Sequence, residues 1–120
     1  MSEAKLPIFC VQPTLLRWLS KLAPIEIEAI TLGFVVLSRR PLSPAVQQHE
    51  RIHFWQYVEL LFVLFPVVYL FDFLFLLARH RDGKKAYLGI RMEQEAYAHM
   101  YEQDYCQKRR AYAWFWNYRL

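Results

Sequence analysis

Residues 49–53 have the sequence His49-Glu50-Arg51-Ile52-His53 and lie in a segment of strongly helical pattern. Side chains four positions apart on a helix differ by about 40° in direction, so both imidazoles reach one point above the same face. Zinc is bound by such pairs, with ring nitrogens about 2.0–2.1 Å from the metal. Glu50 projects to one side of the pair, where its carboxylate can take a proton from water activated by the metal. The motif therefore predicts a zinc site with Glu50 as general base, and the alternative is two surface histidines on an amphipathic helix.

A catalytic zinc site needs a third protein ligand, and the acidic residues and histidines downstream of the motif supply the candidates. These candidates are Asp72, His80, Glu93, Glu95, His99, Glu102 and Asp104. On a helical wheel, Glu93 lies among the apolar residues of its segment, whereas Glu95 lies on the opposite, charged side. A buried carboxylate is costly unless it is paired or binds a metal. The wheel therefore predicts Glu93 as the third ligand and Glu95 on a solvated face; His99, about 120° from Glu93, is not expected to share the metal.

Four further polar side chains are candidates for supporting roles. Gln56 continues the face of the two histidines, so it is expected to orient a ligand or a substrate, or simply to bond to the neighbouring helix. Tyr97 lies one turn after Glu93, where its hydroxyl can donate to a developing oxyanion or simply belong to the core. Glu59 and Asp72 can each orient a ligating imidazole or, as the more ordinary alternative, pair with an arginine.

The segments before the motif are expected to form a short helix and a β element. Residues 13–22 have an amphipathic helical pattern. Residues 25–37 first alternate and then become rich in Ile, Thr, Leu and Val, which is typical of strands, and Gly33 marks a bulge or a tight bend. Ser43 and Pro44 are expected as the N-cap and the first residue of the helix that carries the motif.

The motif helix is expected to end at about Phe65, inside a long apolar segment. Residues 60–78 contain one charged residue, Asp72, and one proline, Pro66. Pro66 is expected to divide this segment into two apolar pieces, either a kinked span or a re-entrant helical hairpin. A chain of this length has difficulty covering so many Leu, Phe and Val side chains, which favours a membrane-associated segment over a buried core helix.

The composition fits a single domain, residues 1–120, in which one part faces lipid and another part faces solvent. Hydrophobic residues make up 56% of the chain and charged residues 22%, and the net charge is +4. Basic clusters beside an apolar segment suit anionic lipid head groups, and without a nucleic-acid motif or a Gly-rich phosphate loop nucleic acid is not an expected partner. Cys10 and Cys106 are expected as reduced thiols. Without a signal-peptide pattern, the protein is expected to be membrane-associated, otherwise cytoplasmic, and not secreted.

A second motif, Glu93-Gln94-Glu95-Ala96-Tyr97, follows the first after about forty residues. The combination resembles the gluzincin metallopeptidases, and among them the short membrane-associated His-Glu-x-x-His proteins of bacteria and phages, over residues 28–105. The zinc ligands and the general base that this resemblance implies are His49, His53, Glu93 and Glu50. It also implies a strand at about residues 29–37 whose edge pairs with the substrate backbone. Tyr97 stands where the better-known membrane peptidases of this clan have Asp.

The expected fold is mainly α, with a short two-stranded element before the motif helix and a hydrophobic helical hairpin that joins the two zinc helices. The expected activity is zinc-dependent hydrolysis of peptide bonds in a peptide or protein substrate. One alternative is a non-catalytic structural or assembly protein that keeps zinc, or only the fold, as a staple; another is a basic membrane-surface adaptor without metal. Glu50 favours the enzyme, because a purely structural zinc helix has no need of this side chain.

Overall fold

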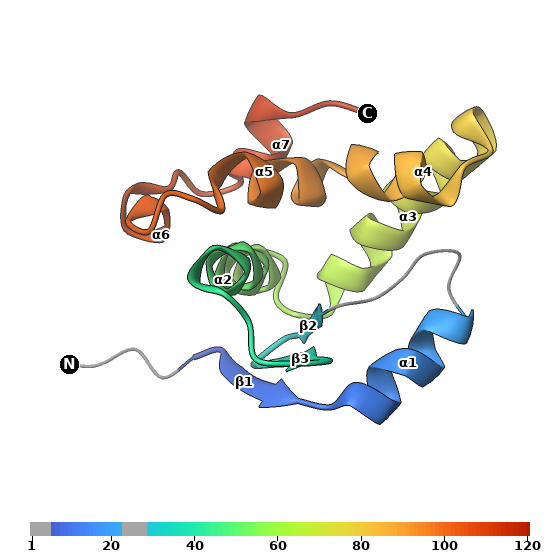
Figure 1. The fold of residues 1–120 in the computed structure, drawn as a ribbon. Helices are drawn as coiled ribbons and strands as arrows, with labels where there is room; N and C mark the ends of the chain where they lie inside the picture. Colours follow the sequence, from blue (N-terminus) through green and yellow to red (C-terminus); the bar gives the residue numbers. More distant parts are fainter. Residues whose placement is uncertain (1–5, 23–28) are drawn as a thin grey trace.

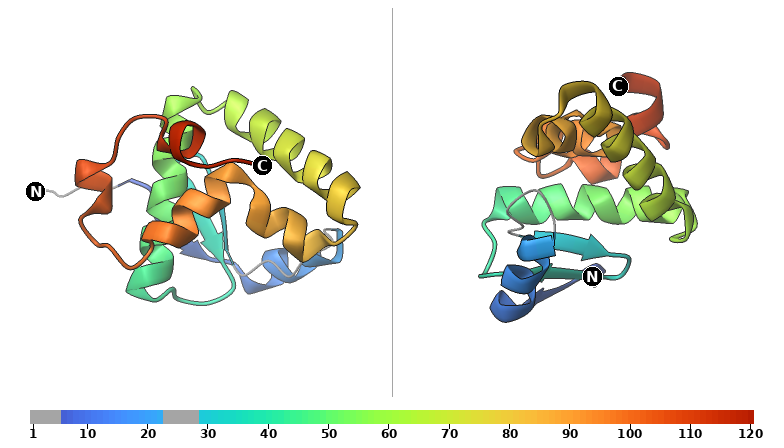
Figure 2. Two further views of the ribbon diagram at one scale, coloured as in Figure 1. Left: turned by 90° about the horizontal axis from the view of Figure 1, so that it is seen from above. Right: turned by 90° about the vertical axis from the view of Figure 1, so that its right-hand side faces the viewer.

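The computed structural model of the chain describes residues 6–22 and 29–120 (Figure 1). Its elements in chain order are β1 (Ile8–Val11), α1 (Pro13–Leu22), β2 (Ala29–Leu32), β3 (Val35–Ser38), α2 (Pro44–Glu59), α3 (Leu64–His80), α4 (Gly83–Gly89), α5 (Arg91–His99), α6 (Tyr105–Lys108) and α7 (Ala113–Asn117). The protein is mainly helical with one small sheet, as the sequence predicts. In Figure 1 and in the right-hand view of Figure 2, α2 lies between a layer formed by the sheet with α1 and a layer formed by α4, α5 and α7.

The sheet has the strand order β1-β3-β2, with β3 parallel to β1 and antiparallel to β2. The bend expected at Gly33 is confirmed, because a two-residue turn joins β2 to β3 and Gly33 has a φ of +68°, which residues with a Cβ rarely adopt. The prediction of two strands is wrong, because the sheet has a third strand, β1. β1 is a run of four residues without an alternating burial pattern, and it pairs with β3 at long range. Residues 25–28 of the expected strand lie outside the described residues.

Local sequence signals place the helices on either side of the sheet segment. The helix predicted for residues 13–22 is confirmed as α1. At the start of α2 the Ser43 hydroxyl accepts a hydrogen bond of 3.3 Å from the Val46 amide, and Pro44 is the first helical residue. The predicted cap is therefore confirmed, and it fixes the residue at which the motif helix begins.

The break between α2 and α3 lies before Pro66 and not at it, so the expected division of residues 60–78 at this proline is wrong. Leu61 and Phe62, just after α2, have φ angles of 55° and 63°, and the axes of α2 and α3 differ by 113°. Pro66 lies in the first turn of α3, where its missing amide proton breaks no helical hydrogen bond. The Phe62 ring stacks on Phe34 with centroids 4.5 Å apart, which packs the break against the turn between β2 and β3.

α3 and α4 form a helical hairpin that leads from α2 to α5. Gly89 allows the two arms to approach closely, since a Cβ at this position would lie 3.0 Å from a methyl carbon of Leu76. A hairpin between α2 and α5 is thus confirmed, but its second arm is α4 and not the second half of residues 60–78. Within the described residues, no single helix has the length and hydropathy to cross a membrane, and α2 and α3 meet that test only together, as a bent pair.

The main core lies where the helical hairpin meets α2, α5 and α7. Its buried side chains are Tyr57, Phe65, Leu76, Ala86, Ile90, Met92 and Trp114. Trp114 comes from α7, so the C-terminal segment closes this core, while its neighbour Trp116 is exposed. Cys10 and Cys106 are free thiols, as expected.

Asp72, the one charge in the apolar segment, is fully buried and pairs with Arg91 of α5. Its carboxylate accepts hydrogen bonds from the Arg91 backbone amide (3.2 Å), from Nε (2.9 Å) and from Nη2 (2.8 Å). The alternative that Asp72 pairs with an arginine is therefore confirmed. The pair ties α3 to the start of α5.

We expect Arg91→Met to lower the free energy of unfolding by about 3–5 kcal/mol, because the buried Asp72 carboxylate would lose its partner. Adding Asp72→Leu to this variant should recover most of the loss, since no charge then remains buried. Arg110→Met makes the same change at an exposed arginine and should stay within about 0.5 kcal/mol of wild type. Denaturant unfolding measures all three variants, and an equal loss in the double variant would show that the lost stability does not come from an unpaired charge.

Candidate metal centre

Two helices bring a carboxylate to the histidine pair. α2 carries His49 and His53 on one face, and α5 places Glu93 against them. Oε1 of Glu93 lies 3.0 Å from Nε2 of His49 and 3.2 Å from Nε2 of His53, and the two Nε2 atoms are 3.2 Å apart. All three side chains are buried. Three atoms that bind metals in proteins therefore converge between α2 and α5.

Glu50 approaches the same cluster from the side of the sheet. Its Oε1 accepts a hydrogen bond of 2.7 Å from the Thr31 hydroxyl of β2, and its Oε2 lies 3.9 Å from Nε2 of His49. One ligand atom each of His49, Glu50 and His53 lie within 4.8 Å of one another, so this buried group could hold a metal ion. The Glu93 oxygen is nevertheless nearer to His49 than that of Glu50, and it also contacts His53. By distance, Glu93 is thus the better placed candidate for a ligand, and Glu50 is tethered beside it.

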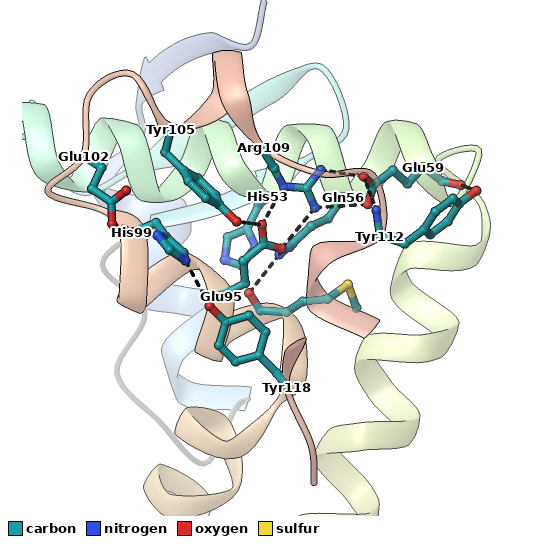
Figure 3. Close-up of polar contacts among 11 residues, drawn as sticks. His53, Gln56, Glu59, Glu95, His99, Glu102, Tyr105, Arg109, Tyr112 and Tyr118 are labelled. Atoms are coloured by element: carbon teal, nitrogen blue, oxygen red, sulfur yellow. Dashed lines mark hydrogen bonds and ion pairs between the residues drawn. The ribbon is translucent and has the colours of Figure 1, made fainter. Parts of the chain in front are cut away.

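A chain of hydrogen bonds fixes the tautomer of His53 (Figure 3). The Gln56 amide nitrogen donates to the Met92 carbonyl (3.0 Å) and to Oε1 of Glu95 (2.9 Å), so the Gln56 oxygen is turned toward His53. This oxygen accepts from Nδ1 of His53 at 2.7 Å. With its proton on Nδ1, a neutral His53 presents the lone pair of Nε2 to the centre. The expected bond from Gln56 to the neighbouring helix is confirmed, and the same side chain also contacts the His53 imidazole.

Glu95 is buried in an ion-pair network, so the expectation of a solvated face is wrong. It is 0% exposed, and it accepts hydrogen bonds from the Tyr105 hydroxyl (2.7 Å) and from Arg109 (Figure 3). Arg109 also pairs with Glu59, which confirms the arginine pairing considered for that carboxylate. The helical wheel fails here because α5 ends at His99, and Arg109 returns to Glu95 from the segment after the helix.

Tyrosines from three helices surround the centre. Tyr69 of α3 donates a hydrogen bond of 2.7 Å to Oε2 of Glu93 and so orients this carboxylate. The Tyr97 ring packs edge-on against His49 with centroids 4.3 Å apart, and its hydroxyl lies 2.9 Å from that of Tyr87 in α4. Tyr97, the candidate for oxyanion stabilisation, thus lies beside a candidate ligand and remains partly exposed to solvent.

The charges of the centre favour a cation beside Glu93. Burial opposes the charged form of His53, but the negative charge of Glu93 and the hydrogen bonds to His53 together outweigh burial and raise its pKa from 6.5 to about 9. Burial also opposes the charged form of Glu93, yet the two imidazoles hold the pKa of this carboxyl well below its usual range. Burial and the charge of Glu93 raise the pKa of Tyr69, so its hydroxyl stays a hydrogen-bond donor at neutral pH.

Other candidates from the sequence have partners elsewhere or are exposed. His99 bonds to Glu102 through Nδ1 (2.8 Å) and to the Tyr118 hydroxyl through Nε2 (3.0 Å), so both of its ring nitrogens are occupied outside the candidate centre (Figure 3). His80 is exposed at the end of α3, and Asp104 is exposed before α6. The structure therefore brings together His49, Glu50, His53 and Glu93, with Gln56 and Tyr97 beside them.

Thr31 and Tyr69 contact the centre, although the sequence reasoning did not single them out. Thr31 is the only polar side chain in residues 29–37, and Tyr69 and Asp72 are the only hydrogen-bonding side chains in residues 64–78. A polar side chain in an otherwise apolar element must find a partner when the element is buried. This signal could have marked both residues, but it names no partner.

The assembled residues could hold a metal ion between α2 and α5, with a further carboxylate next to it. Two imidazoles and a carboxylate are donors that suit zinc. Comparisons of the chain with protein-family models, with curated proteins and with solved structures find no match.

Proposed function

We propose that this protein is a zinc-dependent peptidase in which His49, His53 and Glu93 bind the metal and Glu50 is the general base. The observation that carries the proposal is the triangle formed by the two Nε2 atoms and the Glu93 oxygen, with sides of 3.0, 3.2 and 3.2 Å. Ligand atoms about 2.0–2.1 Å from a tetrahedral zinc ion are roughly 3.3 Å apart. The triangle therefore needs only a small expansion to accept the ion.

The surroundings of the ligands support the same proposal. Gln56 orients His53 through Nδ1, and Tyr69 orients Glu93 through its second oxygen, so both ligands are held by a hydrogen bond on the side away from the centre. Such contacts keep ligating groups in position and are typical of metal sites. The resemblance to the gluzincins, which implies a hydrophobic segment between the histidine motif and the glutamate helix, supports the same proposal.

Zinc bound at this centre would supply a Lewis acid that activates water and polarises the substrate carbonyl. Glu50 is placed to accept the proton from that water, because Thr31 holds Oε1 and Oε2 lies on the side of His49. Glu50 then passes the proton to the leaving amine. We assign Tyr97 as a donor to the developing oxyanion, since Tyr87 can donate to the Tyr97 oxygen and leave the Tyr97 proton for the substrate.

The substrate proposed is a peptide or an unfolded protein segment that lies along α2 beside β2. β2 is an edge strand of the sheet, and the resemblance implies backbone pairing at such an edge. The Thr31 carbonyl, however, already accepts a hydrogen bond of 2.8 Å from the Tyr57 hydroxyl. A substrate that pairs with β2 at Thr31 must therefore displace this hydroxyl.

One observation favours the alternative, a protein in which the metal is only a structural staple. His49, Glu50, His53 and Glu93 are each at most 5% exposed, and structural zinc sites are closed to solvent in this way. A peptidase requires that water and a substrate carbonyl reach the metal. The two functions are therefore separated by activity and not by zinc content alone.

We expect purified protein to contain about one zinc ion per chain and to hydrolyse an unfolded protein substrate. Dialysis against a chelator should abolish both zinc and hydrolysis, and added zinc should restore both. Purified His49→Ala protein should contain no zinc, whereas purified His80→Ala protein, which lacks only an exposed histidine, should contain as much zinc as wild type. Hydrolysis by the metal-free protein would contradict the proposal, and full zinc content without hydrolysis of any unfolded substrate would favour the staple.

A further inference from the structure

One face of α3 is apolar and exposed from just before the helix to Phe75. Val63, just before the helix, is 74% exposed, and Val67, Phe71 and Leu74 are 60%, 59% and 53% exposed. These positions recur every three or four residues, so they form one stripe on the helix surface. The stripe, here called the α3 face, consists of Val63, Leu64, Val67, Leu70, Phe71, Leu74 and Phe75. Soluble proteins rarely leave so many large apolar side chains together in water.

The opposite side of α3 is occupied by the protein itself. Phe65 and Leu76 lie in the main core, and Asp72 is paired with Arg91. Figure 1 and the left-hand view of Figure 2 show α3 at the rim of the molecule beside α4. The helix therefore has one face fixed to the fold and one face that nothing within the described chain covers.

A cluster of basic side chains lies at the C-terminal end of the α3 face. Arg79, Arg81, Lys84 and Lys85 are exposed there, and the Arg79 guanidinium lies 4.7 Å from the centroid of the Phe75 ring. Asp82 is exposed among these four cations and caps α4, so the cluster keeps an excess of positive charge. The stripe itself has no exposed acidic side chain, because the only acid from residue 61 to residue 81 is the buried Asp72. An uncharged, exposed apolar stripe with a net positive end complements a surface that is apolar inside and anionic at its border.

We propose that the α3 face docks on a lipid bilayer that contains anionic lipids. The helix lies along the membrane surface, its apolar side chains enter the boundary between head groups and acyl chains, and the basic cluster contacts the anionic head groups. A second copy of the chain is a poorer occupant, because it would bring a further positive cluster and the same net charge of +4 to the interface.

Docking in this orientation has a consequence for the metal centre. Tyr69 lies on α3 and donates to Glu93, so the centre is one side chain away from the helix that contacts the membrane. The centre is thereby held close to the bilayer surface. The docking itself rests on the α3 face and the basic cluster and does not depend on zinc.

The test is flotation of the purified full-length protein with vesicles of neutral phosphatidylcholine or of phosphatidylcholine with about 30% phosphatidylglycerol. Wild type should bind the anionic vesicles, and the triple variant Val67→Gln, Phe71→Gln, Leu74→Gln should bind at least about 100-fold more weakly. Tyr101→Gln removes a large exposed side chain that lies outside the α3 face and should bind like wild type. A thermal unfolding curve confirms that each variant is folded.

The double variant Lys84→Gln, Lys85→Gln tests the basic cluster without touching the apolar stripe. It should bind anionic vesicles about 30-fold more weakly and neutral vesicles as wild type does, and raised salt should reduce the difference. Undiminished vesicle binding by the triple variant would overturn the proposal. So would a wild type that ignores vesicles but sediments as a dimer which the triple variant dissociates, because the α3 face would then join two copies.

Discussion

Glu93→Ala protein is expected to bind zinc at least about 100-fold more weakly than wild type, whereas Glu50→Gln protein should bind it almost as well. Both carboxylates are buried beside the histidines, so burial does not decide between them. The distances do, because Oε1 of Glu93 lies within 3.2 Å of both Nε2 atoms, whereas Oε2 of Glu50 is 3.9 Å from that of His49. Glu93→Ala also leaves the two buried imidazoles without their nearest anion.

Zinc affinity is measured by competition with a chromophoric chelator, with circular dichroism as the check on folding. Glu102→Ala removes a carboxylate on the segment after α5 and should leave the affinity unchanged. If Glu93→Ala kept its zinc and Glu50→Gln lost it, the third ligand would be Glu50, as the grouping of His49, Glu50 and His53 also permits. If only Glu95→Ala lost zinc, the choice between the two glutamates of α5 would be reversed.

The parts of the fold that follow from local chemistry could be predicted from the sequence. Ser43 and Pro44 mark a helix start because a hydroxyl and a ring at these positions suit the free amides of the first turn. Gly33 marks a tight bend because the turn needs a positive φ. The spacing of His49 and His53 places both imidazoles on one face of any regular helix, and the structure has that helix.

The parts that depend on distant segments could not be predicted in the same way. Thr31 and Tyr69 reach Glu50 and Glu93 from elements with no sequence relation to the motif. Leu61 and Phe62 end the helix although neither residue type usually does so. Their positive φ angles occur where the Phe62 ring stacks on Phe34, in the turn between β2 and β3. Tertiary packing sets the backbone there, and local propensity does not reveal it.

Glu93 and Glu95 show where pattern reasoning works and where it ends. The wheel predicted that Glu93 faces the apolar side, which holds because α5 is regular through this residue. It predicted that Glu95 faces solvent, which is wrong because Arg109 and Tyr105 come back over it after the helix has ended. A wheel describes directions around one helix, and it says nothing about what the rest of the chain places there.

Glu50→Gln is expected to lower hydrolysis of an unfolded protein by roughly 10²–10⁴-fold while zinc content and thermal stability stay near wild type. The amide keeps the size of the side chain, and its oxygen can still accept from the Thr31 hydroxyl, but it cannot take a proton from water. Thr31→Val serves as a partner variant: it removes the tether and leaves the carboxylate, so its loss of activity should be smaller. The readouts are the rate of hydrolysis, the zinc content and the melting temperature of each variant.

The combination of these readouts separates the roles that a buried Glu50 could have. A base acts only in the reaction, so its loss lowers the rate without moving the metal or the melting temperature. A structural carboxylate acts in the folded ground state, so its loss would lower the melting temperature or release zinc, and this result would contradict the mechanism. If wild type and Glu50→Gln hydrolyse equally little, the staple becomes the better proposal, because the Thr31 tether to Glu50 would then only join the sheet to α2.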